Sequence, residues 1–329
     1  MTTTRREFLQ TTSGALAGLA FVGCELMAAA PARAQARRRE VVVSGKRVKT
    51  VDVHAHCAVP EALALMNLKL GGPLYRPDLS MATEVSTRLR AMDEQGIDVE
   101  ALSINPNWYT ADRDLARQII KLQNEKLAEA CAANPERFVA FATVALQYPD
   151  LAAEQLGVVV FIHPQGTGAP TDLQNRLKGN GYLDNVIGNP LETTIALSHL
   201  IFEGTLDKFP GLRICAAHAG GFLPSYAGRS DHGCFTRPDR CAGGPYGPIK
   251  KKPSEYLKQM YYDTMVFTPE AVRHLAAEVG ASQLLVGTDY PYPWTKTAVD
   301  LILNTSGVSD DDRVAMLGAT AMKLLGIKA

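Results

Sequence analysis

The sequence has no excess of either charge and no long, strongly apolar run. Its 34 basic residues balance its 34 acidic residues, so the formal net charge is zero. It has no basic stripe with interleaved aromatic residues, which excludes the usual surface of a nucleic-acid-binding protein. No glycine-rich phosphate fingerprint follows the first predicted strand, which argues against a dinucleotide-binding fold. A hydrophobic content of 46% over 329 residues is typical of a globular chain.

Cysteine is also scarce, with six residues at irregular spacing. Five remain once Cys24, in the N-terminal segment, is set aside, so the chain has no regular disulfide framework. Cys234 and Cys241 share a predicted loop. A bridge between these two and ordinary thiols throughout are the alternatives that the sequence leaves open.

The N-terminal segment has the pattern of an export signal. Residues 4–9 read TRREFL, a twin-arginine pattern, and a mildly apolar stretch and the small-residue site at 32–34 follow. The alternative is an amphipathic or disordered N-terminus. Glycines interrupt the apolar stretch, so we expect no permanent membrane anchor. Because of the twin-arginine pattern, we expect a periplasmic or otherwise exported protein. The predicted boundaries are 1–34 for the twin-arginine signal, 35–46 for a linker and 47–329 for a single catalytic domain.

From residue 47 onward, strand patterns alternate with helical patterns. Seven predicted strands cover residues 48–54, 97–104, 138–146, 158–163, 212–217, 261–265 and 283–288. Predicted helices cover residues 83–95, 112–133, 150–156, 190–202, 222–229, 269–279, 297–303 and 309–325, and residues 231–252 are expected to form an irregular loop. This alternation predicts a parallel sheet, either closed into a barrel or open and doubly wound.

Polar residues at the strand ends favour the barrel. His54, His56, His163, His218 and Asp289 each stand at or near the C-terminal end of a predicted strand. In a βα barrel these ends converge on one mouth, whereas an open sheet spreads them along an edge. We therefore predict a TIM-like barrel with its site at that mouth.

Seven strands are one fewer than a complete (β/α)8 barrel contains. Only a short predicted helix separates the third strand from the fourth, where a βα unit of roughly 30 residues would be expected. We predict an α/β fold of the TIM-like (β/α)8 type that lacks one βα unit between Pro149 and Val158.

The first strand suggests a metal site. Alternate side chains share one face of a strand, so Asp52, His54 and His56 are predicted to project together. With His163 and Asp289, the strand ends offer three imidazoles and a carboxylate, a set that suits zinc with one open position. Taken singly, each residue is also compatible with a structural role.

His218 is followed by Gly220 and Gly221, which we expect to let a ligand approach the backbone closely. A histidine beside a metal centre suits general base and acid catalysis. The alternatives are a fourth imidazole ligand or a core residue.

Five motifs together resemble the amidohydrolase-related metal-dependent decarboxylases, and most of all the aminocarboxymuconate-semialdehyde decarboxylase group. They are DVHAH at 52–56, FIHP at 161–164, PLETTIA at 190–196, HAGG with GRSDHG between 218 and 233, and GTDYPYP at 287–293. The resemblance implies a metal-dependent barrel of eight strands, of which the missing unit would be the fourth.

The resemblance also implies a role for the strand-end residues. His54, His56, His163 and Asp289 would be the ligands of one divalent metal, with zinc expected and manganese as the alternative. His218 would be the catalytic residue that transfers protons.

Further roles concern the substrate. Arg229, eleven residues after His218, would reach into the site of a second subunit to bind a substrate carboxylate, which implies a homodimer. Arg76 would be a second substrate-binding arginine, and Asp52 would support the ligands. Asn185 stands where the family has an aromatic residue that lines the substrate site.

The activity that the resemblance implies is non-oxidative decarboxylation of an unsaturated or aromatic carboxylic acid, with no nucleic acid as partner. A hydrolase that attacks a lactone, amide or carbon–carbon bond is the alternative, because the same ligand set serves both reactions. A degenerate metal-binding protein is a second alternative, because of the missing βα unit.

Overall fold

A computed structural model describes residues 38–70, 84–145, 147–148, 159–164 and 175–328 of the chain. The residues from Arg39 onward form one unit, to which the description below refers. None of the helices in these ranges combines the length and apolar character that a membrane span requires. Arg76, the predicted export signal and the segment from Pro149 to Val158 lie outside the described residues.

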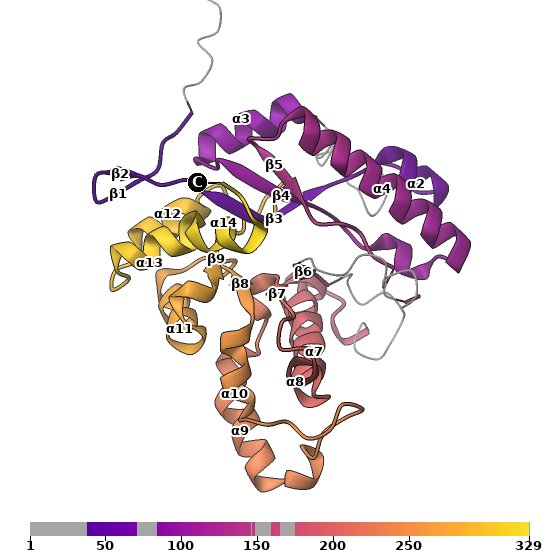
Figure 1. Ribbon diagram of the computed structural model, residues 1–329, viewed down its shortest axis with the longest axis vertical. Coiled ribbons are helices and arrows are strands. Elements are labelled where there is room, and N and C mark those ends of the chain that lie inside the picture. Colours follow the sequence, from indigo (N-terminus) through magenta and orange to yellow (C-terminus); the bar gives the residue numbers. More distant parts are fainter. Residues whose placement is uncertain (1–37, 71–83, 146, 149–158, 165–174, 329) are drawn as a thin grey trace, which may run out of the picture. The chain divides into compact units, whose positions relative to one another are not determined.

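Among the described residues, seven parallel strands form the centre of the fold (Figure 1). One ladder has the order β3 (Val51–Cys57), β4 (Val99–Ile104), β5 (Phe138–Ala140). The other has the order β6 (Val160–Ile162), β7 (Ile214–Ala216), β8 (Tyr261–Asp263), β9 (Leu284–Leu285).

Two parallel bridges, from Asp52 to Val286 and from Ala55 to Tyr290, join β3 to the chain that leaves β9. The strand order is therefore β5-β4-β3-β9-β8-β7-β6, the arrangement of a TIM-like barrel. Each strand lies within or overlaps a predicted one. In the described part of the chain no pairing joins β5 to β6, and the Phe141 and Phe161 rings stack there with centroids 5.2 Å apart.

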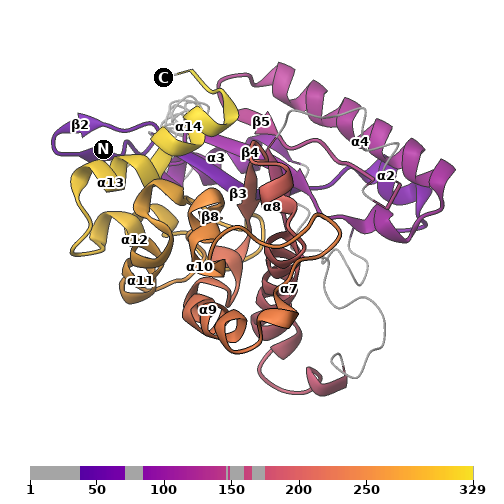
Figure 2. The same ribbon diagram turned by 60° about the horizontal axis from the view of Figure 1, so that its bottom comes forward.

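Helices flank the strands, as the alternating pattern predicted. In both views, α3 and α4 lie beside β4 and β5 (Figures 1 and 2), and in Figure 1 α7 to α10 lie on the side of β6 to β8. The bounds are α2 (Pro60–Leu65), α3 (Val85–Gln95), α4 (Arg113–Ala133), α7 (Asn189–Phe202), α8 (Thr205–Lys208), α9 (Ala227–Thr236), α10 (Pro253–Tyr256), α11 (Pro269–Val279), α12 (Ala298–Asn304), α13 (Asp310–Val314) and α14 (Thr320–Leu325).

The ends of the longer helices follow local sequence signals. Gly96 ends α3 in a left-handed conformation with φ of 75°, which costs glycine little because it has no Cβ. The Asp112 side chain caps α4 by accepting a hydrogen bond from the Leu115 amide, and the Thr268 side chain caps α11 in the same way. These interactions explain why the helix ends were predicted to within a few residues.

A short antiparallel hairpin precedes the first barrel strand. It pairs β1 (Val42–Val43) with β2 (Lys46–Arg47). A separate core cluster then forms where the strands begin, with buried Val51, Val99 and Leu285 packed against Ala321 and Leu324 of α14. These apolar residues occupy the starts of the strands, which leaves the polar residues at the other end.

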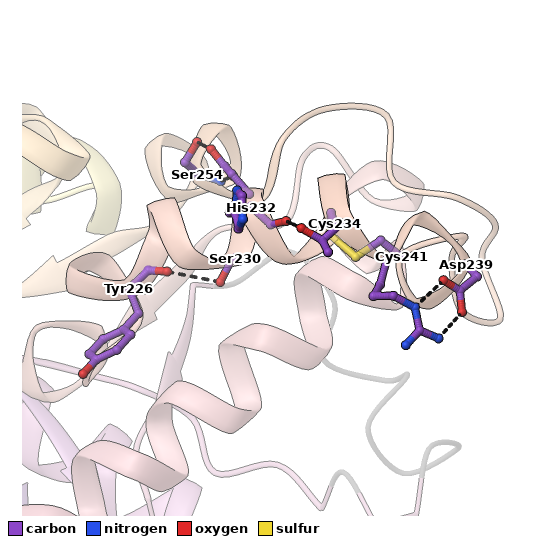
Figure 3. The surroundings of a disulfide bond; sticks show 10 residues. Tyr226, Ser230, His232, Cys234, Asp239, Cys241 and Ser254 are labelled. Atoms are coloured by element: carbon purple, nitrogen blue, oxygen red, sulfur yellow. Dashed lines mark hydrogen bonds and ion pairs between the residues drawn. A yellow bond between two sulfur atoms is a disulfide. The ribbon is translucent and has the colours of Figure 1, made fainter.

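Helix α9 differs from its prediction. A helix over 222–229 and an irregular loop from 231 were expected, but α9 runs from Ala227 to Thr236. Asp231 holds the later segment, because its carboxylate accepts hydrogen bonds from the Ser254 amide and hydroxyl at 2.9 and 2.7 Å. A disulfide joins Cys234 on α9 to Cys241 after it (Figure 3). These tertiary contacts extend the helix past its predicted end.

Candidate metal centre

Four side chains from three strand ends converge on one point. Donor atoms of His54, His56, His163 and Asp289 all lie within 4.8 Å of one another. The Nε2 atoms of His54 and His56 are 3.1 Å apart, and Asp289 Oδ1 lies 2.9 Å from His56 Nε2 and 3.2 Å from His54 Nε2. Donor atoms that share an ion at about 2.1 Å are typically about 3 Å apart, so these spacings fit a single transition-metal ion.

A β-bulge contributes to this convergence. Asp52 is opposite Glu100, but Ala55 is opposite Leu102, so β3 carries one extra residue between these pairs. A bulge redirects the side chains around it. His54 and His56 meet at the cluster, while the Asp52 carboxylate accepts hydrogen bonds from the His54 amide at 2.9 Å and from Thr288. Asp52 thus supports the backbone behind the cluster and is not one of the four donors.

Asp289 Oδ1 is the clearest sign that the cluster suits a cation. This atom is buried and, despite its short distances to two imidazoles, has no hydrogen bond of suitable geometry among the described residues. A buried carboxylate oxygen without a partner is costly. A divalent ion would supply the missing partner, so the donor set and its geometry fit one.

In two of the imidazoles, a hydrogen bond fixes the Nδ1 atom, the ring nitrogen that does not face the cluster. His163 Nδ1 lies 2.7 Å from the carbonyl oxygen of Pro164, and His54 Nδ1 lies 2.6 Å from Asp263 Oδ2. Each Nδ1 therefore carries the proton and donates it, which leaves the Nε2 lone pair for a metal.

The electrostatics of the cluster favour positive charge. Burial by itself would lower the pKa of His54, but Asp289 and Asp263 together raise it to about 10. Burial would raise the pKa of Asp289, but His54 and His56 hold it well below its usual value. Burial lowers the pKa of His163 well below its usual value, so this imidazole is neutral. The carboxylates around these imidazoles therefore favour a positive charge at the cluster.

His218 lies beside the four donors. The centroid of its ring is 5.4 Å from that of His54 and 5.2 Å from that of His163. Burial, followed by the neighbouring His54, lowers the pKa of His218 to about 4. At neutral pH the imidazole is therefore uncharged and can accept a proton.

The two glycines after His218 do not face a ligand. A Cβ on Gly220 would lie 2.7 Å from the Tyr262 ring, and one on Gly221 would lie 2.0 Å from the carbonyl oxygen of Pro190. The expectation that they expose backbone to a ligand was wrong. They are glycines because the turn packs directly against β8 and α7.

Of the two predicted arginines, the structure describes only Arg229, which is not part of this cluster within one chain. Arg229 is exposed on α9 and makes no hydrogen bond or ion pair with a described residue. Arg76 lies outside the described residues. Asn185 lies in the π-helical turn Asp184–Gly188 that leads into α7.

Sequence reasoning missed two residues near the cluster. Asp263 ends β8 and contacts His54, but as a single carboxylate outside any metal-ligand motif it gave no signal beyond its strand-end position. Tyr292 has its ring centroid 5.4 Å from that of His56, and its hydroxyl accepts a hydrogen bond from Asn105 at 2.8 Å. Burial and Asp289 raise the pKa of Tyr292 to about 12.

With this geometry in view, the chain was compared with known proteins. The sequence model of the Amidohydrolase family matches residues 152–327, and the chain belongs to that family. It is 25% identical over 319 residues to 2-amino-3-carboxymuconate-6-semialdehyde decarboxylase of Dictyostelium discoideum, covering 84% of each chain. It is 28% identical over 322 residues to gamma-resorcylate decarboxylase of Rhizobium sp. (strain MTP-10005), covering 83% of this chain and 97% of that one.

Solved structures that resemble the chain are also of decarboxylases. The dihydroxybenzoic acid decarboxylase of Polaromonas sp. JS666, with bound manganese and 2-nitroresorcinol, matches with a TM-score of 0.72 and 25% identity, covering 86% of this chain and 98% of that one. The 2,6-dihydroxybenzoate decarboxylase complexed with 2,6-dihydroxybenzoate matches with a TM-score of 0.71 and 26% identity, covering 85% and 99%. The names of these relatives describe decarboxylases, and one of the two solved structures contains manganese.

Proposed function

We propose that this protein is a metal-dependent, non-oxidative decarboxylase of an unsaturated or aromatic carboxylic acid. The observation that carries the proposal is the position of the His218 imidazole, whose ring centroid lies 5.2 Å from that of His163, beside four convergent metal donors. Relatives named as decarboxylases align over more than four-fifths of the chain and support the choice of reaction. The small-molecule substrate is therefore a carboxylic acid.

His54, His56, His163 and Asp289 would hold the metal. A divalent cation there supplies a Lewis acid that polarises substrate oxygen atoms. His218 accepts a proton within the site and then delivers it to the substrate carbon. The bond between that substrate carbon and the carboxylate carbon breaks, its electron pair stays on the substrate carbon, and the proton from His218 forms the new C–H bond there as CO₂ leaves.

The finer features are also part of the proposal. Zinc suits three imidazoles and a carboxylate, and the manganese in a related structure makes that metal the alternative. We propose a homodimer in which Arg229, exposed on α9, binds a substrate carboxylate in the partner's site, since a guanidinium pairs with a carboxylate through two hydrogen bonds. We further propose twin-arginine export.

The test is CO₂ release from a panel of hydroxylated benzoates and conjugated dicarboxylic acids, with lactones and amides as competing substrates. The mature protein is assayed with Zn²⁺, with Mn²⁺ and after metal removal. We expect metal-dependent CO₂ release from at least one acid. Hydrolysis of a lactone or amide without CO₂ release would contradict the proposal and favour a hydrolase.

A further inference from the structure

We propose that Asp263 is a positioning residue that holds the metal ligand His54 and the proton-transferring His218 in one arrangement. The part of this inference that concerns proton transfer rests on the function proposed above, whereas the part that concerns metal binding is independent of that function. Asp263 contacts the metal ligand His54 but is not itself one of the four donors, and in our account it does not contact the substrate.

Both oxygens of the Asp263 carboxylate accept two hydrogen bonds each. Oδ2 accepts hydrogen bonds from His54 Nδ1 at 2.6 Å and from the His218 amide at 3.0 Å. Oδ1 accepts from the Ala219 amide at 2.8 Å and from the Met265 amide at 3.1 Å. The side chain is fully buried. One oxygen atom therefore links the ring of a metal ligand to the backbone of the proposed acid and base.

The turn that carries His218 requires such a partner. His218 and Ala219 have φ of 51° and 56°, a region that residues other than glycine rarely adopt. Successive amides in this kind of turn point into one concavity, which binds an anion. Charge-assisted hydrogen bonds from Asp263 fill that concavity and stabilise an otherwise unfavourable backbone.

The His218 ring itself has little else to orient it. Its Nδ1 atom is buried and has no hydrogen-bond partner in the described part of the chain. Its position follows from the backbone turn and from packing against the His54 and His163 rings. Because Asp263 holds both the turn and the His54 ring, displacing this carboxylate moves His218 relative to the metal donors.

Through its hydrogen bond with His54, Asp263 also affects the affinity of the centre for a metal. A carboxylate that accepts the Nδ1 proton fixes the tautomer and makes Nε2 a better ligand, and loss of such a partner typically costs 10- to 100-fold in metal affinity. The Gly287 backbone packs closely against this side chain, because a Cβ on Gly287 would lie 2.7 Å from Asp263 Cβ. A glutamate would carry its oxygens one methylene further from the backbone, so the informative variant keeps the size of aspartate.

The experiment compares Asp263→Asn with a matched control, Asp98→Asn. Asp98 is also a buried carboxylate and accepts hydrogen bonds from the Thr50 amide at 2.7 Å and from Arg47 at 2.6 Å, where β3 and β4 begin. An asparagine NH₂ group cannot accept a hydrogen bond, so each variant loses part of its network. Both are expected to unfold at lower temperature than the wild type, and only Asp263→Asn to alter the centre.

Three properties are measured on the chain from residue 35 onward. Mn²⁺ affinity, measured by competition with a chromogenic chelator, should fall about 10- to 100-fold in Asp263→Asn and stay within about twofold in Asp98→Asn. The visible spectrum of the Co²⁺-loaded protein should change only in Asp263→Asn. At saturating Mn²⁺, kcat should fall in Asp263→Asn while KM stays within about twofold, as expected when a proton donor is misplaced.

Wild-type Mn²⁺ affinity and an unchanged Co²⁺ spectrum in Asp263→Asn would overturn the inference, as would equal losses in the control. If Asp263→Asn does not fold, nitrogen-15 NMR of the wild-type Zn²⁺ protein decides the question. A protonated His54 Nδ1 supports the inference, and an unprotonated one overturns it. Absence of decarboxylation in the wild type would refute only the proposed function, because affinity, spectrum and tautomer do not depend on turnover.

Discussion

Arg88 Nη1 lies 2.7 Å from Glu100 Oε2, and both side chains are almost completely buried. Arg88 also donates a hydrogen bond to the carbonyl oxygen of His56, and its guanidinium carbon lies 4.6 Å from the centre of the Tyr290 ring. Tyr290 follows Asp289 directly. The ion pair thus lies against the two chain segments that supply metal donors.

We predict that Arg88→Met lowers the free energy of unfolding by about 3–5 kcal/mol, because it leaves the Glu100 charge buried without a partner. The double variant Arg88→Met/Glu100→Leu should recover most of that loss, since apolar residues of similar volume tolerate burial. Urea unfolding measures both. A double variant no more stable than the single one would contradict this account of the pair.

His218→Asn should reduce kcat about 10²- to 10⁴-fold without loss of bound metal, because it removes the proton-transferring group and none of the four donors. Asparagine is the suitable replacement because it tolerates the left-handed backbone at this position. Steady-state CO₂ release and metal analysis are measured on the same sample. Undiminished CO₂ release would exclude the role assigned to His218.

The proposed dimer is tested by complementation. In a purified heterodimer of one His218→Asn chain and one Arg229→Ala chain, one site keeps its own His218 and receives Arg229 from the other chain. We predict about half the activity of the wild-type dimer, whereas each variant homodimer is nearly inactive. If Arg229 acted within its own chain, mixing would restore nothing.

Gly221→Ala should lower the free energy of unfolding by about 3 kcal/mol or more. The new Cβ would lie 2.0 Å from the Pro190 carbonyl oxygen, and Gly221 has φ of 67°, which is unfavourable for alanine. The control is Gly211→Ala, where nothing lies within 4 Å of the new Cβ. Thermal unfolding compares the two, and equal stability would show that the turn after His218 is not tightly packed.

The four metal donors were identifiable from the sequence because each follows a run of β-branched or apolar residues. In a parallel barrel such strand ends meet at one mouth, so strand order alone brings them together. The bulge after Asp52 was not predictable, because it depends on the register of β3 against β4. It separates Asp52 from His54 and His56, which simple alternation had placed on one face.

Other residues depend on contacts between distant segments. Asp263 becomes informative only when the fold places it against His54, 209 residues earlier in the chain. Arg88 belongs to a helix with many polar residues, and nothing in its local sequence indicates burial against Glu100. The extent of α9 depends on Ser254 and on the bridge to Cys241. The proposed role of Arg229 in a partner's site depends on a second subunit, which one sequence does not describe.

Metal bound per chain is the measurement that tests the central claim most directly. The chain from residue 35 onward, shown to be folded, is stripped of metal, titrated with Zn²⁺ and with Mn²⁺, and compared with His54→Ala/His56→Ala. The account predicts about one equivalent of divalent metal per wild-type chain and none in the double variant, because two of the four donors are then missing. A folded wild-type protein that binds neither ion would contradict it and favour a degenerate protein that retains only the barrel.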